Sequence, residues 1–337
     1  MKTIRWPLLV FPLILLCVYF PFSSPAMAAV HQPFSVLLSR QTLHAQPGAM
    51  KEYPIPTVDS GPFAITRGTD GNVWFTEFSG NQIGKLTPQG KFTEYPIPTL
   101  RTFPTGITTG PDGNVWFTEG NASQIGKITP DGNITEYPLP FPSSPEGITT
   151  GPDGNIWYAD GDGWIGKMTP DGMLTRYFIP YSFPGAIVAG PDGNLWFTES
   201  NTNQIGKITT NGTVTQYALP TPNSEPIGIC KGPHGHLWFT EFNANQIGTI
   251  TTGGNVTEYV IPTANSWPEY IASGADGNLW FTEYQANQIG RVTPQGMFTQ
   301  YAIPTANSQP EGITNGPHGT IWFDEGRGNK IGKIKVK

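Results

Sequence analysis

One repeated unit dominates this chain and constrains its fold more than any other feature. The clearest copy is GPDGNLWFTESNTNQIGKITTNGTVTQYALP, from Gly190 to Pro220. Its tryptophan recurs with spacings of 42, 41, 39, 42, 42 and 42 residues, at Trp74, Trp116, Trp157, Trp196, Trp238, Trp280 and Trp322. Copies at so even a period are typical of a repeat array or a propeller. Although 337 residues could hold two domains, the repeat predicts a single domain over residues 51–337.

Each copy divides into four short runs separated by turns that contain glycine. In the clearest copy the runs cover residues 185–189, 194–199, 204–209 and 213–219. They are rich in Ile, Val, Thr and aromatic residues, which favours strands. Asp-Gly-Asn stands between the first two runs, and glycine permits the positive φ of a hairpin turn. A calcium loop is the alternative, but single carboxylates at this spacing do not match one.

Four antiparallel strands in each of seven copies predict an all-β fold, a seven-bladed β-propeller. We expect the seven tryptophans to lie at the interfaces between blades. The chain ends in a segment that matches the third run, residues 331–337, and the missing fourth run appears at residues 51–57 as KEYPIPT. The sequence therefore predicts that an N-terminal strand completes the last blade and closes the ring, which removes two open sheet edges.

The first 28 residues have the pattern of a secretory signal peptide. Lys2 and Arg5 precede an apolar run, and Ala26-Met27-Ala28 forms a small-residue cleavage site. We expect cleavage after Ala28 and a secreted, periplasmic or cell-surface protein. An uncleaved membrane anchor is the alternative, which prolines within the short apolar run disfavour. Residues 29–50 show no periodicity and predict a flexible leader.

Charge and cysteine content narrow the class of partner. The formal charge is −6, and loss of Lys2 and Arg5 leaves 17 basic against 25 acidic residues, or −8. No cluster of basic residues is present, so nucleic acid and anionic membranes are not expected partners. Removal of Cys17 leaves Cys230 alone, so no intramolecular disulfide can form. We expect a monomer with a small-molecule or cyclic-peptide ligand.

Two positions of each repeat are expected to meet on one face, near the central channel. The first follows the proline that opens the innermost strand, and it varies: Phe63, Thr105, Glu146, Gly185, Ile227, Glu269 and Glu311. The second is the acid that ends W-F-T-E, and it is constant: Glu77, Glu119, Asp160, Glu199, Glu241, Glu283 and Glu325. The constant acids could form a cation-binding funnel, but a residue shared by all blades favours a structural role as a cap of strand ends.

The variable position is the more informative of the two. It is acidic only in the third, sixth and seventh copies, so Glu269 and Glu311 lie in adjacent blades and could share a proton or a metal ion. Solvated acids at the rim are the alternative. The loops of this face also carry aromatic residues that could stack on a ligand: Phe103, Phe141, Trp164, Phe183, Trp267, Tyr270 and Tyr284.

Over residues 51–337 the consensus G-P-D-G-N-[LVI]-W-F-T-E, N-x-I-G-[KR]-[IL]-T and T-E-Y-P-[IL]-P resembles the virginiamycin B (streptogramin B) lyase family. The resemblance implies a seven-bladed propeller. It also implies a magnesium-assisted elimination that linearises cyclic depsipeptide antibiotics by breaking the ester C–O bond without water.

The family motif gives the site residues that the resemblance implies. Histidines occupy the variable position of the last two blades, one of them as the general base, where this chain has Glu269 and Glu311. The two metal-binding positions hold Gln309 and Glu325. A carboxylate can replace a histidine base where burial raises its pKa toward neutrality.

Two functions follow as alternatives. In the first, the protein is a carbon–oxygen lyase with Glu311 as base, Mg²⁺ at Glu325 and Gln309, and a substrate surface formed by Glu269, Glu146, Trp267, Tyr270 and Tyr284. In the second, the same acidic and aromatic face binds a small molecule, glycan or peptide without reaction. A calcium-dependent lactonase of the related six-bladed kind is disfavoured by the count of seven repeats.

Overall fold

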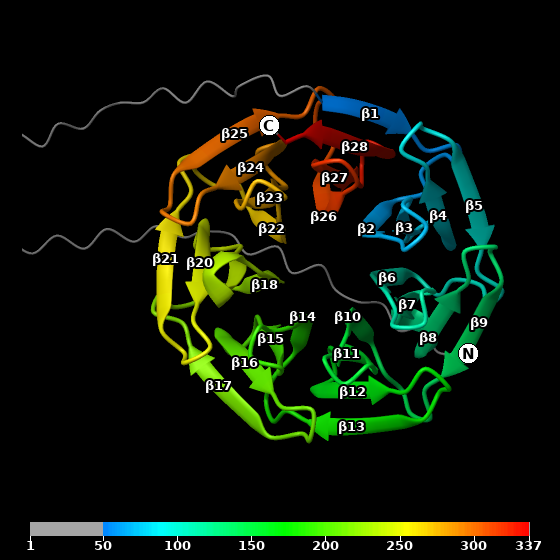
Figure 1. Ribbon diagram of the computed structural model, residues 1–337, viewed down its shortest axis with the longest axis horizontal. Helices are drawn as coiled ribbons and strands as arrows, with labels where there is room; N and C mark the ends of the chain where they lie inside the picture. Colours follow the sequence, from blue (N-terminus) through cyan, green and yellow to red (C-terminus); the bar gives the residue numbers. More distant parts are fainter. Residues whose placement is uncertain (1–49, 337) are drawn as a thin grey trace, which may run out of the picture. The chain divides into compact units, whose positions relative to one another are not determined.

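The computed structural model describes residues 50–336, so the predicted signal peptide and, apart from Met50, the predicted leader lie outside the described residues. Seven four-stranded antiparallel sheets surround a central axis, which confirms the predicted seven-bladed propeller (Figure 1). Within the described range, no helix is both long enough and apolar enough to cross a bilayer.

Six blades are formed by consecutive strands. They are β2 (Pro62–Arg67), β3 (Val73–Glu77), β4 (Gln82–Leu86), β5 (Phe92–Pro96); β6 (Pro104–Thr109), β7 (Val115–Glu119), β8 (Gln124–Ile128), β9 (Ile134–Pro138); β10 (Pro145–Thr150), β11 (Ile156–Asp160), β12 (Trp164–Met168), β13 (Leu174–Phe178); β14 (Pro184–Ala189), β15 (Leu195–Glu199), β16 (Gln204–Ile208), β17 (Val214–Ala218); β18 (Pro226–Lys231), β19 (Leu237–Glu241), β20 (Gln246–Ile250), β21 (Val256–Val260); and β22 (Pro268–Ser273), β23 (Leu279–Glu283), β24 (Gln288–Val292), β25 (Phe298–Ala302). Short 3₁₀ turns lie at η1 (Gly120–Ala122) and η2 (Pro233–Gly235).

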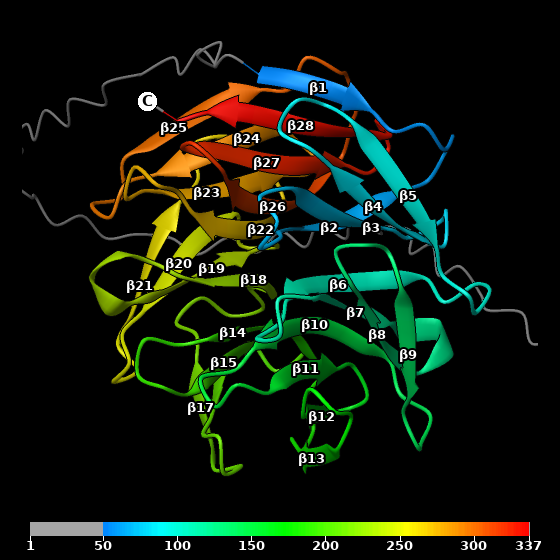
Figure 2. The same cartoon turned by 45° about the vertical axis from the view of Figure 1, so that its right-hand side comes forward.

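The seventh blade joins the two ends of the described chain. It contains β26 (Pro310–Gly316), β27 (Thr320–Glu325) and β28 (Lys330–Lys335), and its outer strand is β1 (Met50–Pro54). β1 pairs antiparallel with β28, with Tyr53 opposite Ile331, and the two strands lie side by side in both views (Figures 1 and 2). The predicted closure by an N-terminal strand is confirmed.

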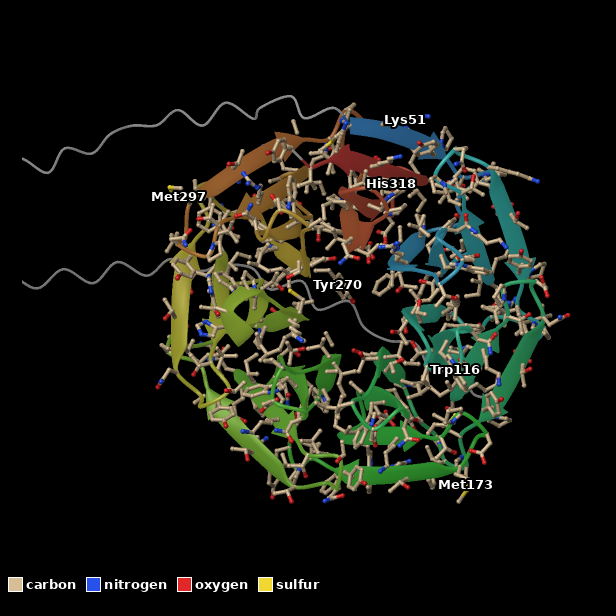
Figure 3. The ribbon with its side chains drawn as sticks, in the orientation of Figure 1. Lys51, Trp116, Met173, Tyr270, Met297 and His318 are labelled. Carbon is tan, nitrogen blue, oxygen red and sulfur yellow. The ribbon has the colours of Figure 1, made fainter. Side chains whose placement is uncertain are left out.

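The tryptophans hold neighbouring blades together, as the repeat predicts. Trp74 of β3 is buried against Val115 and Phe117 of the next blade, and Trp322 of β27 packs in the same way on Val73 of the first blade. In Figure 3 Trp116 lies within a blade, while Met173 and Met297 mark the outer edge and Tyr270 lies near the axis. The apolar core is therefore a ring of interfaces between blades, and the innermost strands face the channel.

Candidate functional site

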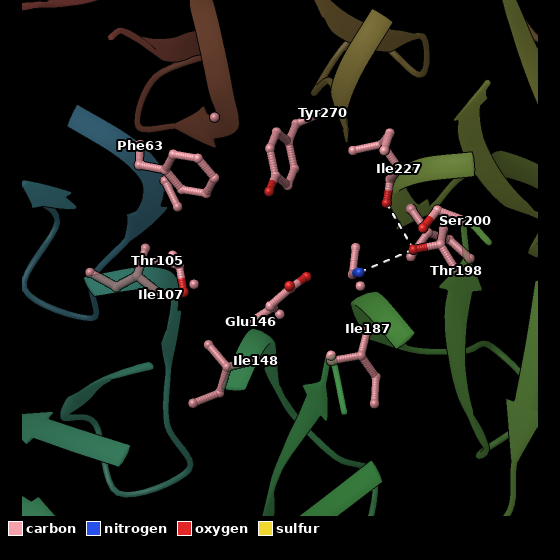
Figure 4. A pocket seen from close by; sticks show the side chains of 18 of the residues that line it. Phe63, Thr105, Ile107, Glu146, Ile148, Ile187, Thr198, Ser200, Ile227 and Tyr270 are labelled. Atoms are coloured by element: carbon pink, nitrogen blue, oxygen red, sulfur yellow. Dashed lines mark hydrogen bonds between the residues drawn. The ribbon is translucent and has the colours of Figure 1, made fainter. Parts of the chain in front are cut away.

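The innermost strands surround a central cavity of about 710 Å³. Its wall includes Phe63, Thr105, Glu146, Asp162, Phe183 and Tyr270. Two of the predicted substrate residues, Glu146 and Tyr270, point into it (Figure 4). Glu269, Glu311, Trp267, Tyr284, Gln309 and Glu325 are not part of this wall.

Threonines of the second strands fix the spacing of the innermost strands. Thr198 accepts a hydrogen bond from the Ala186 backbone N–H (3.0 Å) and donates one to the Ile227 carbonyl of the next blade (2.9 Å), as Figure 4 shows. Thr282 makes the same pair of contacts to Tyr270 and to the Glu311 carbonyl. The backbone that carries Glu311 is thus fixed from the neighbouring blade, which preorganises the variable position.

Glu269 and Glu311 form an acidic pair on the innermost strands of adjacent blades. Burial raises the pKa of Glu311 to about 7, and one of its carboxyl oxygens, Oε2, has no hydrogen-bond partner among residues 50–336. Burial, followed by the charge of Glu311, raises the pKa of Glu269 to about 8. At neutral pH the pair therefore holds one carboxyl group close to its titration point and one that is mostly protonated.

Tyr270 brings the third acid of the variable position into the same group. Burial raises the pKa of its phenol, and the charges of Glu269, Glu146 and Glu311 raise it further. These three carboxyl groups therefore act on one neutral phenol. Burial, followed by the charges of Asp160 and Asp162, raises the pKa of Glu146 as well. The structure thus brings four of the residues predicted from sequence into one acidic group at the channel.

Asp324 belongs to this group and was missed at the sequence level. It stands in β27 where five of the other six copies have threonine and the third has Ala159, and its Oδ1 accepts the Gly312 N–H at 3.1 Å, as the threonines do for their own blades. It is fully buried, and burial together with the charge of Glu311 raises its pKa well above the usual value. The available signal was the single letter that changes W-F-T-E to W-F-D-E.

Trp267 and Tyr284 lie at the edge of the acidic group. Trp267 is 39% exposed and its ring lies 5.4 Å from that of Phe242. The Trp267 carbonyl accepts the backbone N–H of Tyr284 at 3.1 Å. Burial, and then the charges of Glu311 and Glu269, raise the pKa of Tyr284. Both aromatic residues are therefore available to a ligand that approaches Glu311.

An aromatic row continues from Tyr270 into the first two blades. Phe63 meets Tyr270 edge-on at 6.2 Å, Phe78 lies 6.0 Å from Phe63, and Phe103 stacks on Phe78 at 4.9 Å. Phe78 was missed from sequence because it directly follows a constant acid and breaks no motif. Such a row offers an apolar surface beside the acidic group.

The constant acids do not form a funnel at the channel. All seven, including Asp160, are fully buried. Burial raises the pKa of Glu77 and Glu119 to about 8 and that of Glu241, Glu283 and Glu325 to about 7. Capping by backbone N–H groups, the structural role expected from sequence, is seen at Asp160, which accepts from Ser144 and Asp162. Both oxygens of Glu77, Glu119, Glu241 and Glu325 lack a partner among residues 50–336.

Gln309 and Glu325, the positions implied for magnesium, do not fit a metal centre as placed. The neighbours of Glu325 include Ser308, Lys330 and Glu52, the last two on the outer strands, whereas Glu311 leans over Gly326 beside the first blade. Magnesium requires near-octahedral oxygen donors, commonly including one or two carboxylates. Within residues 50–336, no group of three His, Cys, Asp or Glu side chains is placed to hold a metal ion.

Comparison with known proteins gives one consistent result. The model of the Virginiamycin B lyase family matches residues 40–183 and 163–337. A solved virginiamycin B lyase from Staphylococcus aureus is 44% identical, with a TM-score of 0.82, over 86% of this chain and 99% of that one. A catalytically inactive His-to-Ala variant of the S. aureus enzyme, solved with quinupristin, is 43% identical, with a TM-score of 0.82, over 86% and 99%.

A curated virginiamycin B lyase from Bacillus licheniformis matches over a short segment. The two proteins are 51% identical over 41 residues, which is 12% of this chain and 14% of the relative. That match is about the length of a single repeat, so it reflects the shared repeat unit, whereas the solved structures match the whole propeller.

Proposed function

This chain belongs to the virginiamycin B lyase family, and from that premise we propose that it is an exported, monomeric carbon–oxygen lyase that opens a cyclic depsipeptide of the streptogramin B type. The observation that supports the proposal is the state of Glu311. Burial raises the pKa of this carboxyl group to about 7, and it stands where the family motif has its histidine base. A base with a pKa near the working pH is the most effective.

The reaction needs a base and a group that receives the leaving carboxylate. Glu311 would take a proton from the carbon next to the one that carries the ester oxygen. The electrons of that C–H bond form a C=C bond, the C–O bond breaks, and the ester carbonyl leaves as a carboxylate. Glu269, mostly protonated at neutral pH because its pKa is about 8, would donate a hydrogen bond to that carboxylate. No water is consumed.

The remaining residues would hold the substrate. Trp267 and Tyr284 supply a partly exposed aromatic edge, and Tyr270 and Glu146 line the cavity that opens beside it. Magnesium is the metal that the resemblance implies, and when bound it would polarise the ester carbonyl. Because Gln309 and Glu325 do not fit such a centre as placed, we assign no step to it.

The test is incubation of the purified mature protein with quinupristin, with magnesium in one arm and EDTA in the other. Elimination gives a linear product of the same mass as the macrocycle, with a new chromatographic retention time, whereas ester hydrolysis adds the mass of one water. We expect the isomeric product, lost in Glu311→Gln and retained in Glu311→His. Glu283→Gln, in a buried acid away from the cavity, is the control. Quinupristin that binds but stays intact would identify a binding protein instead.

Export is tested separately. Expression of the full-length chain and mass measurement of the protein recovered outside the cytoplasm should give the species that begins at Ala29. A mature protein that retains Met1–Ala28 would show that the segment is an anchor. Light scattering on the same sample measures the oligomeric state.

A further inference from the structure

The same trio of side chains, an aspartate, a tryptophan and a basic residue, recurs in the blades. It lies at the start of the second strand, opposite to the end that carries the constant acid. In five blades the tryptophan Nε1–H donates to an aspartate of the Asp-Gly-Asn turn, as Trp116 does to Asp112 at 3.1 Å. A basic side chain from the third strand lies over the same indole ring, as Lys127 does at 5.0 Å from its centroid. The ammonium of Lys127 is 4.0 Å from the Asp112 carboxylate, and that of Lys167 is 3.7 Å from Asp153. In three of the five blades the trio is therefore an ion pair over an aromatic ring, the third being Arg291 with Asp276 at 2.9 Å.

The fifth blade lacks both charges of the trio. Its turn reads Gly-Pro-His-Gly-His, with His234 in place of the aspartate, and Thr249 stands opposite Trp238 where other blades have lysine or arginine. Thr249 is too short to reach over the ring, and its hydroxyl is bonded to the Leu237 carbonyl at 3.0 Å. The indole Nε1–H of Trp238 is buried and has no hydrogen-bond partner among residues 50–336.

The seventh blade also lacks the aspartate, but its tryptophan N–H still has a hydrogen-bond acceptor and its ring still has a basic side chain over it. There Trp322 donates to the Thr320 hydroxyl at 3.0 Å, and Lys333 still lies 4.8 Å from its ring centroid. The fifth blade has no such replacement. A buried N–H without an acceptor costs free energy, so its presence beside a cavity points to a ligand that supplies the acceptor.

A pocket of about 210 Å³ occupies the place of the missing pair. It is lined by His234, His236, Trp238, Thr249, Tyr259 and Pro294, among others. Tyr259 stacks on Trp238 at 5.8 Å, as in the other blades, but without a cation over the stack. Pro294 corresponds to Pro130 of the second blade, whose carbonyl accepts from the Lys85 ammonium at 2.9 Å.

We propose that this pocket binds a small zwitterion, an amino acid with its amino group at the β or γ position. The ammonium takes the place of the missing lysine over Trp238 and Tyr259 and donates to the Pro294 carbonyl. The carboxylate accepts from Trp238 Nε1 and from the imidazoles of His234 and His236. The ion pairs at the same place in other blades have separations of 2.9–4.0 Å, which is the spacing between opposite charges that such a ligand must match. The pocket volume of about 210 Å³ is large enough for a molecule of that size.

This site is separate from the candidate active site. His234 and His236 precede the start of β19, whereas Glu241 and the channel-side loops lie at the other end of that strand. Binding here can therefore be measured without reference to lyase activity.

The probe is 4-aminobutyrate, titrated into the mature protein by calorimetry and by tryptophan fluorescence. We expect saturable binding at one site with a Kd on the order of 1 mM. n-Butylamine carries only the ammonium group and butyrate only the carboxylate, and each should bind at least about tenfold more weakly than 4-aminobutyrate. Equal affinity for either half-ligand, or no saturable binding of 4-aminobutyrate, would overturn the proposal.

Three variants locate the site. His234→Asp with Thr249→Lys rebuilds the ion pair found in other blades and should abolish binding while the protein keeps its Tm. Glu146→Gln, at the channel, should bind as the parent does. Trp238→Phe removes only the N–H and should weaken 4-aminobutyrate while leaving n-butylamine unchanged. Undiminished binding in the rebuilt variant, or Zn²⁺ binding through the two histidines with no amino-acid binding, would refute the site.

Discussion

The seven constant acids are buried, and we therefore predict that the stability of the fold decreases as the pH rises. Burial raises the pKa of Glu77 from 4.5 to about 8, with a smaller contribution from the charge of Glu94. A carboxyl group whose pKa is raised by folding stabilises the fold while it is protonated. That stability is fully present below a pH of about 4.5 and is lost as the pH rises through about 8.

The perturbation is Glu77→Gln, which keeps the shape of the side chain and removes its titration. From about pH 6 to about pH 9, a pKa raised from 4.5 to about 8 costs the parent about 3 kcal/mol of unfolding free energy. The variant does not incur this loss. Its stability relative to the parent should therefore increase by about 3 kcal/mol over that interval.

Glu283→Gln is the matched control within the same ring. Both oxygens of Glu283 accept from the Gln300 amide, at 2.9 and 2.8 Å, and its pKa is raised only to about 7. The same calculation gives about 1.4 kcal/mol, so the gain should be about half that of Glu77→Gln.

The assay is urea unfolding of the parent and both variants at several pH values, followed by tryptophan fluorescence. The midpoint of the parent should fall with rising pH across this range, and the curves of the variants should fall less steeply. Parallel curves for parent and Glu77→Gln would show that this carboxyl group does not titrate with a raised pKa, and the argument from burial would fail.

Three further changes test other parts of the fold. Glu52→Ala removes the acceptor for Thr305 N–H, Thr305 hydroxyl and the Lys330 ammonium. It should lower stability by about 2–3 kcal/mol in thermal unfolding, whereas Lys51→Ala on the exposed side of β1 should change little. Gly84→Ala would place a Cβ 2.1 Å from Phe75 Cζ and should cost at least about 1–3 kcal/mol, with partial rescue by Phe75→Leu in the same measurement. Trp196→Phe should cost about 1 kcal/mol more than Trp238→Phe in urea unfolding, because only Trp196 loses a hydrogen bond, to Asp192. Equal losses in the two tryptophan variants would mean that the indole N–H contributes nothing.

The fold could be predicted from sequence because each part of the repeat has a local physical meaning. Glycine turns, β-branched runs and an evenly spaced tryptophan are each sufficient to place a turn, a strand or an interface. The closing strand was predictable as well, since KEYPIPT supplies the one run that the last copy lacks.

The site was only partly predictable because it depends on the side of the strand to which each residue points. Alternate residues of a strand face opposite sides, so Glu77 shares the side of Phe75, which packs toward the preceding blade, whereas Trp74 packs on the following one. That alternation places the constant acids between blades and away from the channel. The gathering of Glu146, Glu269 and Glu311 around Tyr270 depends on the curvature of the whole ring, which no local pattern contains.

The pairing of β1 with β28 links the first described strand of the chain to its last. Because synthesis runs from the N-terminus, β1 emerges long before its partner exists and must wait for the final blade. A chain that lacks the last strand leaves Tyr53 without Ile331, and it leaves both β1 and β27 of the seventh blade without the strand that joins them. Closure of the ring therefore depends on β28, and until that strand is present the seventh blade keeps two unpaired strand edges.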